Sequence, residues 1–245
     1  MLHKTKGIVL RCVKFGDTSI IATIFTEILG IQSYIIKGVR KASKKNSNNA
    51  VFFQPAAILD LEVNHNTLKN LQYIKEYSWS FLYQHVFFDV IKNAVVSFNM
   101  ELLQQVLKQP GPLPELFEFA ESSLHYADVS PASGTANLPL YFMLQLGRLL
   151  GFQLYGEYDE STPVLDLQAG EFVHEIPVHP FFLINEEAKI TSEFMHITQF
   201  GLLEKIFLNQ QKRRALLTAY VQYIKLHTEG MNDIKSFLIL QEVLS

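Results

Sequence analysis

The residues of this chain best suited to a chemical task are five cations within nine positions: Lys37, Arg40, Lys41, Lys44 and Lys45. A polar run, 46–49, follows them, and strand-like apolar segments lie before and after, at 30–36 and 55–63. This pattern predicts a cationic loop between two strands. Each phosphate that Lys or Arg neutralises releases a condensed counterion, so such a loop suits a polyanion. Nucleic acid is therefore the first hypothesis for a ligand.

Other residues of the same region are weaker candidates for the same role. The cations Arg11, Lys14, Lys4 and Lys6 precede the loop and could contact phosphates. Aromatic rings could stack on exposed bases, a contact worth about 1–3 kcal/mol per base. Tyr34 and Phe53 are the preferred rings because they flank the basic loop, although most aromatic side chains of a small barrel fill its core.

Charge divides the chain unevenly. Residues 1–80 hold eleven Lys and Arg against five Asp and Glu, whereas the remaining residues hold ten against nineteen, and the net charge is -3. Such asymmetry indicates that one part of a chain binds a polyanion, and solubility alone is the simpler alternative.

Motifs of catalysis and metal binding are missing from the sequence. Residues 38–41 lack the glycine spacing and the Lys-Ser/Thr pair of a nucleotide-binding loop, and no Gly-x-Ser-x-Gly elbow occurs. Cys12 is the single cysteine, which excludes an intrachain disulfide and a cysteine-based zinc site. Two weak metal alternatives stay open: His174 and His179 with Asp166 and Glu171, and the acidic group Glu157, Asp159 and Glu160. We expect no catalytic residue, no cofactor and no metal.

Residues 4–76 are typical of β-structure. Alternation is clearest in 57–63, where Ala57, Leu59, Leu61 and Val63 share one face. The expected strands are 5–15, 20–26, 31–39, 57–63 and 68–77. Five short strands in so small a region predict a closed barrel of the OB-fold type, which binds oligonucleotides with one sheet face and its loops.

After Trp79 the apolar period becomes helical. The expected helices are 81–108, 115–126, 138–150, 193–208, 212–227 and 236–244, with a loop at 130–134 and an irregular insert at about 151–182. The fold class is thus α+β and multidomain, with an OB-fold barrel at 1–79 and a mostly helical domain at 80–245. No apolar run reaches the roughly 18–20 residues of a membrane span, and no signal peptide precedes the first strand, so we expect a cytoplasmic protein.

Both ends of the sequence resemble a known family. Residues 6–11, Phe15-Gly16-Asp17, 24–27, Leu29-Gly30 and 36–40 are similar to the amino-terminal signature of the bacterial recombination and repair protein family RecO. Arg213-Arg214, Tyr220, Tyr223, His227 and 235–237 are similar to its carboxy-terminal part. The resemblance implies an OB-fold joined to a helical domain that often carries a four-cysteine zinc module. Here no cysteine follows Gly151, so the insert is expected to be a zinc-less counterpart of that module.

The resemblance also implies a function and partners. A protein of this family is a recombination mediator that binds single- and double-stranded DNA and anneals complementary strands. With RecR it displaces single-strand-binding protein so that RecA can load, and it is nucleoid-associated when engaged on DNA. The tail of single-strand-binding protein docks on the helical domain, where this chain offers Arg148, Lys205, Lys212, Arg213 and Arg214. Two alternatives to the mediator are a non-catalytic protein adaptor and an RNA-binding OB-fold protein.

Overall fold

The computed structural model describes residues 1–39, 49–108 and 111–244. Two compact units divide the chain. The first combines Met1–Phe88 with Val96–His125, and the second combines Asp89–Val95 with Tyr126–Ser245. The first unit contains the barrel, and the second contains most of the remaining helices together with a small sheet.

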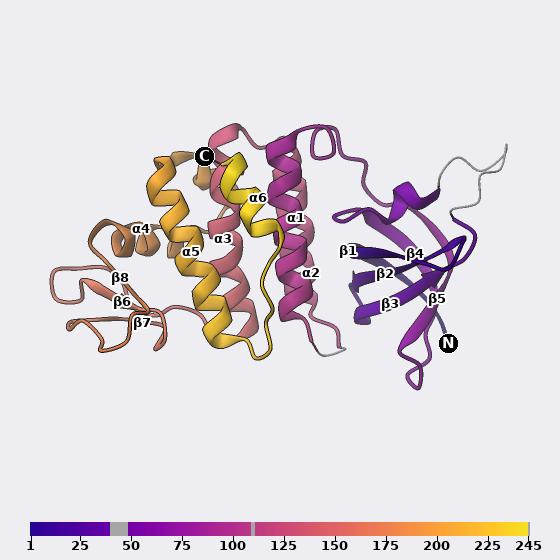
Figure 1. Cartoon of the computed structure of the whole chain (residues 1–245), viewed down its shortest axis with the longest axis horizontal. Coiled ribbons are helices and arrows are strands. Elements are labelled where there is room, and N and C mark those ends of the chain that lie inside the picture. Colours follow the sequence, from indigo (N-terminus) through magenta and orange to yellow (C-terminus); the bar gives the residue numbers. More distant parts are fainter. Residues whose placement is uncertain (40–48, 109–110, 245) are drawn as a thin grey trace. The chain divides into compact units, whose positions relative to one another are not determined.

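The five predicted strands form a closed barrel. They are β1 (Leu2–Phe15), β2 (Ser19–Thr26), β3 (Gly30–Ile36), β4 (Ile58–Asn64) and β5 (Leu71–Trp79), paired in the order β1-β2-β3-β5-β4 (Figure 1). β1 closes the barrel by pairing with β4, and only β3 and β5 are parallel. A 3-10 turn, η1 (Asn49–Phe53), precedes β4. This arrangement confirms the predicted OB-fold barrel.

Strand alternation fills the barrel. Ile20, Ala22 and Ile24 of β2 point inward and are fully or nearly fully buried, as are Leu59, Leu61 and Val63 of β4. Gly7 of β1 lies between these side chains of β2 and β4, because a Cβ there would come within 2.7 Å of both Ile24 and Leu61. The core therefore requires a residue without a side chain at this position of β1.

Helix α1 (Val90–Val106) begins later than the predicted start at residue 81. The Tyr83 hydroxyl donates to the Ala56 carbonyl at 2.7 Å, and its ring contacts Phe81 and Phe87, which holds this segment in a turn conformation. Asp89 then caps the helix, since its carboxylate accepts from the Lys92 backbone N–H at 2.9 Å. Helix α2 (Pro114–Val129) follows and places Phe117 against Phe25 of β2, with ring centroids 5.5 Å apart.

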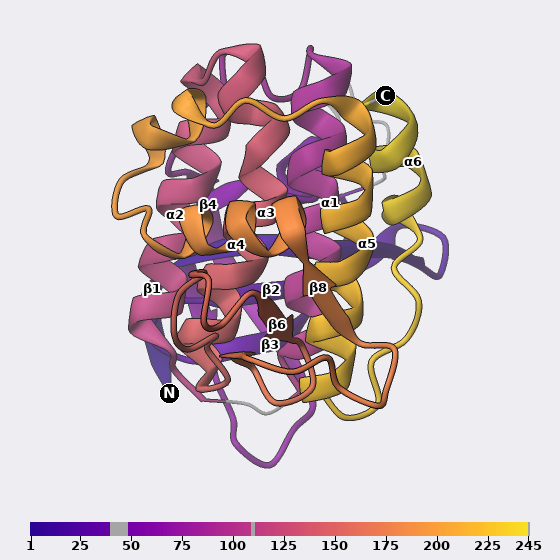
Figure 2. The same cartoon turned by 90° about the vertical axis from the view of Figure 1, so that its left-hand side faces the viewer.

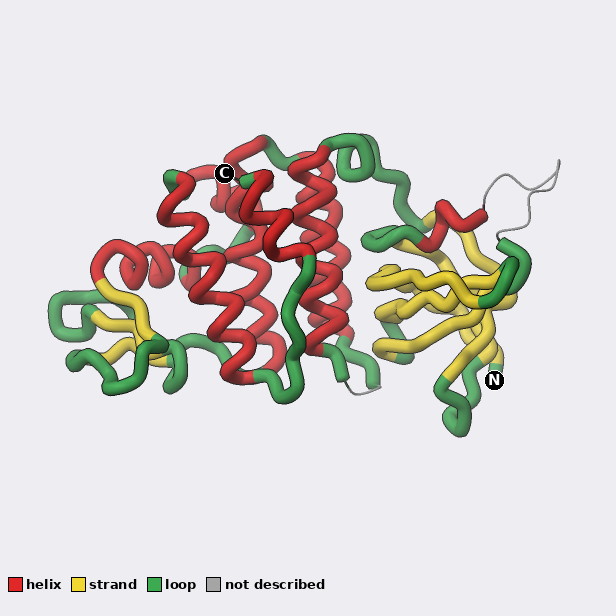
Figure 3. Tube along the Cα trace, in the orientation of Figure 1, coloured by secondary structure: helices red, strands yellow, loops and turns green. Residues whose placement is uncertain are grey.

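The second unit is mostly helical (Figures 2 and 3). It contains α3 (Ala132–Leu150), α4 (Asn185–Met195), the 3-10 helix η2 (Phe200–Lys205), α5 (Gln210–His227) and α6 (Ser236–Val243). α3 contacts both α4 and α5, and Figure 2 shows α4 running across them. Of the helices in the described parts of the chain, none is long and apolar enough to cross a membrane.

Three predictions for this unit were wrong in detail. The expected loop at 130–134 contains the start of α3, because Pro131 provides an extended N-cap and Ser130 hydrogen-bonds Thr135. The expected helix at 193–208 is instead α4 followed by η2; the His196 ring bonds the Ser192 carbonyl where α4 ends. The insert at 151–182 is less irregular than expected. It carries β6 (Val164–Asp166), β7 (Glu171–Val173) and the start of β8 (Phe182–Ile184), whose three-residue length gives too little alternation to detect.

Candidate nucleic-acid interface

The basic cluster is only partly within the described structure. Arg40, Lys41, Lys44 and Lys45 lie outside the described residues. Lys37, its first member, is exposed directly after β3, and its ammonium lies 5.6 Å from the centroid of the Tyr73 ring on β5. At that distance the ring face attracts the cation. Lys37 therefore places a positive charge over an aromatic ring at the edge of the barrel.

Strand register extends this edge into a surface. Two cross-strand rows run over the outside of β1, β2, β3 and β5: Arg11–Thr23–Ser33–Leu71 and Val13–Ile21–Ile35–Tyr73. Phe15 continues the outward positions of β1 beyond the second row. We call these two rows, with Phe15 and Lys37, the cationic face. Its described side chains include two cations and no carboxylate.

Two aromatic rings of the cationic face are accessible to a ligand. Phe15 is 49% exposed and Tyr73 is 45% exposed. A half-exposed ring on a sheet surface can stack on a base without any change in the core. The sequence analysis preferred Tyr34 and Phe53. Strand alternation could have indicated Tyr73, because it shares the outward side of β5 with the exposed Lys75, whereas the intervening Ile74 packs against the core.

The expectation for Tyr34 and Phe53 needs correction. Both side chains are 0% exposed and belong to the barrel core. Tyr34 pairs with Ala22 in an inward-facing register, and Phe53 contacts the ring of Tyr77 at 4.9 Å between centroids. Because no base can reach either ring without opening the barrel, neither belongs to the interface.

Lys4 and Lys6 lie on a different side of the barrel. Register places Lys4 beside Glu62 and Lys6 beside Asp60, and Glu62 lies beside Glu76. Lys6 donates to Glu121 of α2 at 2.8 Å, a hydrogen bond that raises the pKa of its ammonium. Lys75 donates to Glu62 at 2.6 Å and lowers the pKa of that carboxyl. We call this surface the acid-paired face: Lys4, Lys6, Asp60, Glu62, Lys75, Glu76 and Ser78.

The register therefore separates the weaker candidates of the sequence analysis. Arg11 belongs to the cationic face, together with Lys37. Lys14 is exposed three residues further along β1, opposite Ile20 near the end of the hairpin. Lys6 already pairs with Glu121, and Lys4 lies beside Glu62, so phosphate contacts there compete with neighbouring carboxylates.

The candidate partner-binding cations of the second unit have different surroundings. Arg148 donates to Gln145 at 2.8 Å, and Lys212 pairs with Glu186 at 2.5 Å. Arg213 is half-buried and donates to the Leu208 carbonyl at 3.0 Å, and burial lowers the pKa of its guanidinium. Lys205 ends η2. Arg214 lines a groove of about 520 Å³ between α5 and residues 180–182.

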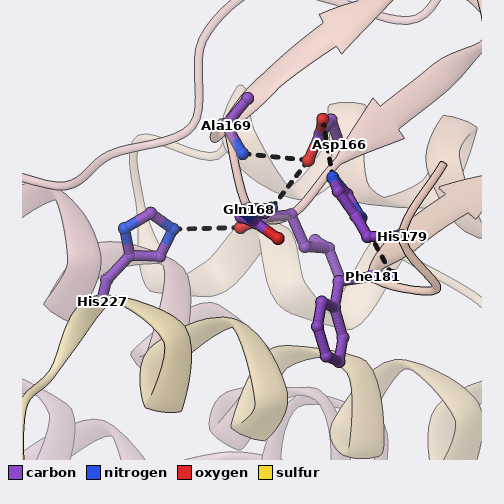
Figure 4. A network of polar contacts seen from close by, with 7 residues as sticks. Asp166, Gln168, Ala169, His179, Phe181 and His227 are labelled. Carbon is purple, nitrogen blue, oxygen red and sulfur yellow. Dashed lines mark hydrogen bonds and ion pairs between the residues drawn. The ribbon is translucent and has the colours of Figure 1, made fainter. Parts of the chain in front are cut away.

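Two of the four residues considered for zinc, Asp166 and His179, belong to a local hydrogen-bond network (Figure 4). One oxygen of Asp166 accepts from the backbone N–H groups of Gln168 and Ala169, at 2.8 and 2.9 Å, and the other lies 3.3 Å from His179 Nε2. His227 of α5 bonds the Leu167 carbonyl at 3.0 Å. His174 bonds the Ser161 carbonyl instead, and no group of three His, Cys, Asp or Glu among the described residues could hold a metal.

The acidic group at 157–160 is also engaged locally. Asp159 accepts from both Ser161 and Thr162, and these bonds lower its carboxyl pKa to about 2. Such a turn satisfies the carboxylate within its own loop.

Two family profiles together match most of the chain. The profile "Recombination protein O N terminal" matches residues 1–83, and "Recombination protein O C terminal" matches residues 88–236. The protein named DNA repair protein RecO from Christiangramia forsetii is 30% identical over 243 residues, 99% of each chain. The protein of the same name from Phocaeicola vulgatus is 28% identical over 245 residues, all of each chain. The chain therefore belongs to the RecO family of DNA repair and recombination proteins.

Proposed function

We propose that this protein is a recombination mediator that binds single- and double-stranded DNA through the cationic face and anneals complementary strands. The observation that carries the proposal is the face itself, where Arg11 and Lys37 share a sheet surface with Phe15 and Tyr73 and no described carboxylate lies in either row. Cations that neutralise phosphates bring two polyanions together without reading their sequence. The exposed rings add sequence-tolerant stacking on single strands.

The basic loop extends the same proposal. Arg40, Lys41, Lys44 and Lys45 follow Lys37 in the sequence, at the end of β3, and would add phosphate contacts to those of the cationic face. Lys14 would contribute a further contact near the β1–β2 turn.

Partners belong to the proposal as well. With RecR, the protein would help RecA load onto DNA coated with single-strand-binding protein, in the cytoplasm and at the nucleoid. The groove beside Arg214 suits the acidic, apolar tail of single-strand-binding protein, because it combines a cation with the apolar side chains of Phe181, Phe182 and Ala215. Arg214→Glu should weaken binding of a synthetic tail peptide, measured by fluorescence anisotropy. Unchanged peptide affinity would remove this groove from the docking site.

Strand annealing tests the central claim. Two complementary oligonucleotides, one fluorescent and one quenching, are mixed with the protein over a salt series. We expect acceleration without nucleotide or metal that fades as salt rises. Arg11→Ala/Lys37→Ala should slow annealing, whereas Lys4→Ala/Lys75→Ala removes the same charge from the acid-paired face and should change it little. Equal losses in the two variants would contradict the assignment to one face, and no acceleration by the unmodified protein would contradict annealing itself.

A further inference from the structure

A cleft opens beside the first row of the cationic face. Its volume is about 540 Å³, and Thr23 and Ser33 of that row contribute to its lining. The other walls come from the turn between β4 and β5 and from Leu107, Lys108, Gly111 and Pro112, which follow α1. All described lining residues belong to the first unit. The cleft is thus continuous with the surface proposed to bind DNA.

The lining groups are of three kinds that match the parts of one nucleotide. Lys69 and Lys108 supply positive charge for a phosphate. Thr23, Ser33 and Asn70 supply hydroxyl and amide groups that can hydrogen-bond the edge of a base. Ile31, Leu107 and Pro112 supply apolar surface for the faces of a base or a sugar.

The cleft is held open by local contacts that need no ligand. Gln32 donates to the Leu29 carbonyl at 2.9 Å, and Thr26 Oγ1 donates to the Gly30 carbonyl at 2.8 Å, which fixes the β2–β3 turn. Gly30 has φ +65° and approaches the backbone of Gly111 so closely that a Cβ would overlap its carbonyl. The turn and Gly111 therefore meet beside the cleft.

His65 is among the residues that line the same cleft. Its Nδ1 is buried and has no hydrogen-bond partner among the described residues. Burial, together with the charges of His3 and the N-terminus, lowers the pKa of the imidazole, so the neutral ring prevails at neutral pH.

We propose that this cleft binds a single unstacked nucleotide of single-stranded DNA. This inference rests on the proposed function and adds a reason why the protein would prefer single-stranded over duplex DNA. The volume lies within the roughly 300–1,000 Å³ typical of small-molecule pockets. A base that remains paired within a duplex cannot enter, so the cleft strengthens binding to single strands alone.

The test compares two strand forms of one sequence. A single-stranded oligonucleotide carrying a 2-aminopurine base, and its blunt duplex, are titrated with the protein, since 2-aminopurine fluorescence rises when the base leaves the stack. Ser33→Phe fills the cleft from an outward strand position. It should lower single-strand affinity about tenfold, the loss expected for one base contact, and abolish the fluorescence rise. Duplex affinity should stay within about twofold.

Two further variants keep the test decisive. Ser78→Phe places the same side chain on the acid-paired face and should change neither affinity. Lys69→Met/Asn70→Ala changes two exposed positions of the β4–β5 turn and should reproduce the selective loss without disturbing the sheet.

Each other outcome overturns the inference in a distinct way. Equal losses for both strand forms, or no loss in either, would remove the unstacked base from the cleft while leaving DNA binding intact. Binding of free thymidine monophosphate that Ser33→Phe abolishes, with oligonucleotide affinity unchanged, would assign the cleft to a free nucleotide. A protein that binds neither strand form would overturn the proposed function, and this inference with it.

Discussion

The two exposed sides of the barrel carry cations in similar numbers but differ in what faces them. On the acid-paired face, Lys4 and Lys6 lie beside Glu62 and Asp60, and Lys75 donates to Glu62. On the cationic face, Arg11 lies beside Thr23, and Lys37 lies over Tyr73. The comparison teaches that strand register, rather than the number of Lys and Arg, decides which positive charges are available to a polyanion.

The acidic residues of 1–80 are also unevenly distributed over the barrel. Three of the five acidic residues in 1–80 belong to the acid-paired face: Asp60, Glu62 and Glu76. Residues 1–80 hold eight further Lys and Arg outside this face, and the other acidic residues of the stretch are Asp17 and Glu27. The surface that can attract phosphates is therefore more positive than the average for the region.

The largest expected effect comes from the four cations of the basic cluster that follow Lys37 in the sequence. Arg40→Ala/Lys41→Ala/Lys44→Ala/Lys45→Ala should reduce the slope of log affinity against log salt by up to about 3–4 units, because each lost phosphate contact removes about one counterion. Filter binding or anisotropy over a salt series measures the slope. An unchanged slope would exclude the loop from the DNA interface.

The exposed rings should give the next largest effect. Phe15→Leu/Tyr73→Leu keeps apolar bulk but removes stacking, so single-strand affinity should fall by on the order of tenfold and duplex affinity by less. Phe207→Leu, at a 90% exposed ring of the second unit, serves as the control and should have no effect. Titration of a fluorescent oligonucleotide distinguishes the variants, and equal losses for both strand forms would argue against stacking.

Removing two carboxylates from the acid-paired face should reduce the difference between the two sides. Glu62→Gln/Glu76→Gln releases Lys4 and Lys75 from their carboxylate neighbours, so the salt slope for duplex binding should steepen by about 1–2 units. A slope that does not change would mean that the carboxylates do not restrict these cations.

The smallest expected effect is a change in the pKa of Glu62. The hydrogen bond from Lys75 lowers the pKa of Glu62, so the interaction stabilises the fold above the ordinary carboxyl pKa and is lost as pH falls through the lowered value. Lys75→Met should raise the Glu62 pKa toward its ordinary value, and carbon-detected NMR of the side-chain carboxyl measures this. A pKa that stays lowered would assign the shift to Lys4, whose charge acts in the same direction.

The fold was largely predictable because its signals are local. Clear alternation identified the strand at 57–63, and loss of that period after Trp79 separated the barrel from the helices. The start of α1 was missed because the hydroxyl of Tyr83 bonds Ala56, a contact across 27 residues that no local period reveals. Three-residue strands such as β6 are too short to show a period at all.

The class of ligand at the interface was predictable from the sequence, but only some of the residues that form the interface were. Positive charge in the barrel predicted a polyanionic ligand. The assignment of Lys4 and Arg11 to different faces depends on how β1 pairs with β4 and with β2. The choice of Tyr34 over Tyr73 failed for the same reason. Proximity to the basic loop says nothing about whether a ring points into the barrel, and only the register settles it.

The approach of Gly30 to Gly111 has an evolutionary consequence. The atoms that a side chain at position 30 would meet are backbone atoms, including the carbonyl carbon of Gly111 at 2.5 Å and its nitrogen at 2.8 Å. Every residue type at position 111 has these atoms, so no compensatory substitution there can make room. Any substitution of Gly30 therefore requires the backbone at position 111 to move.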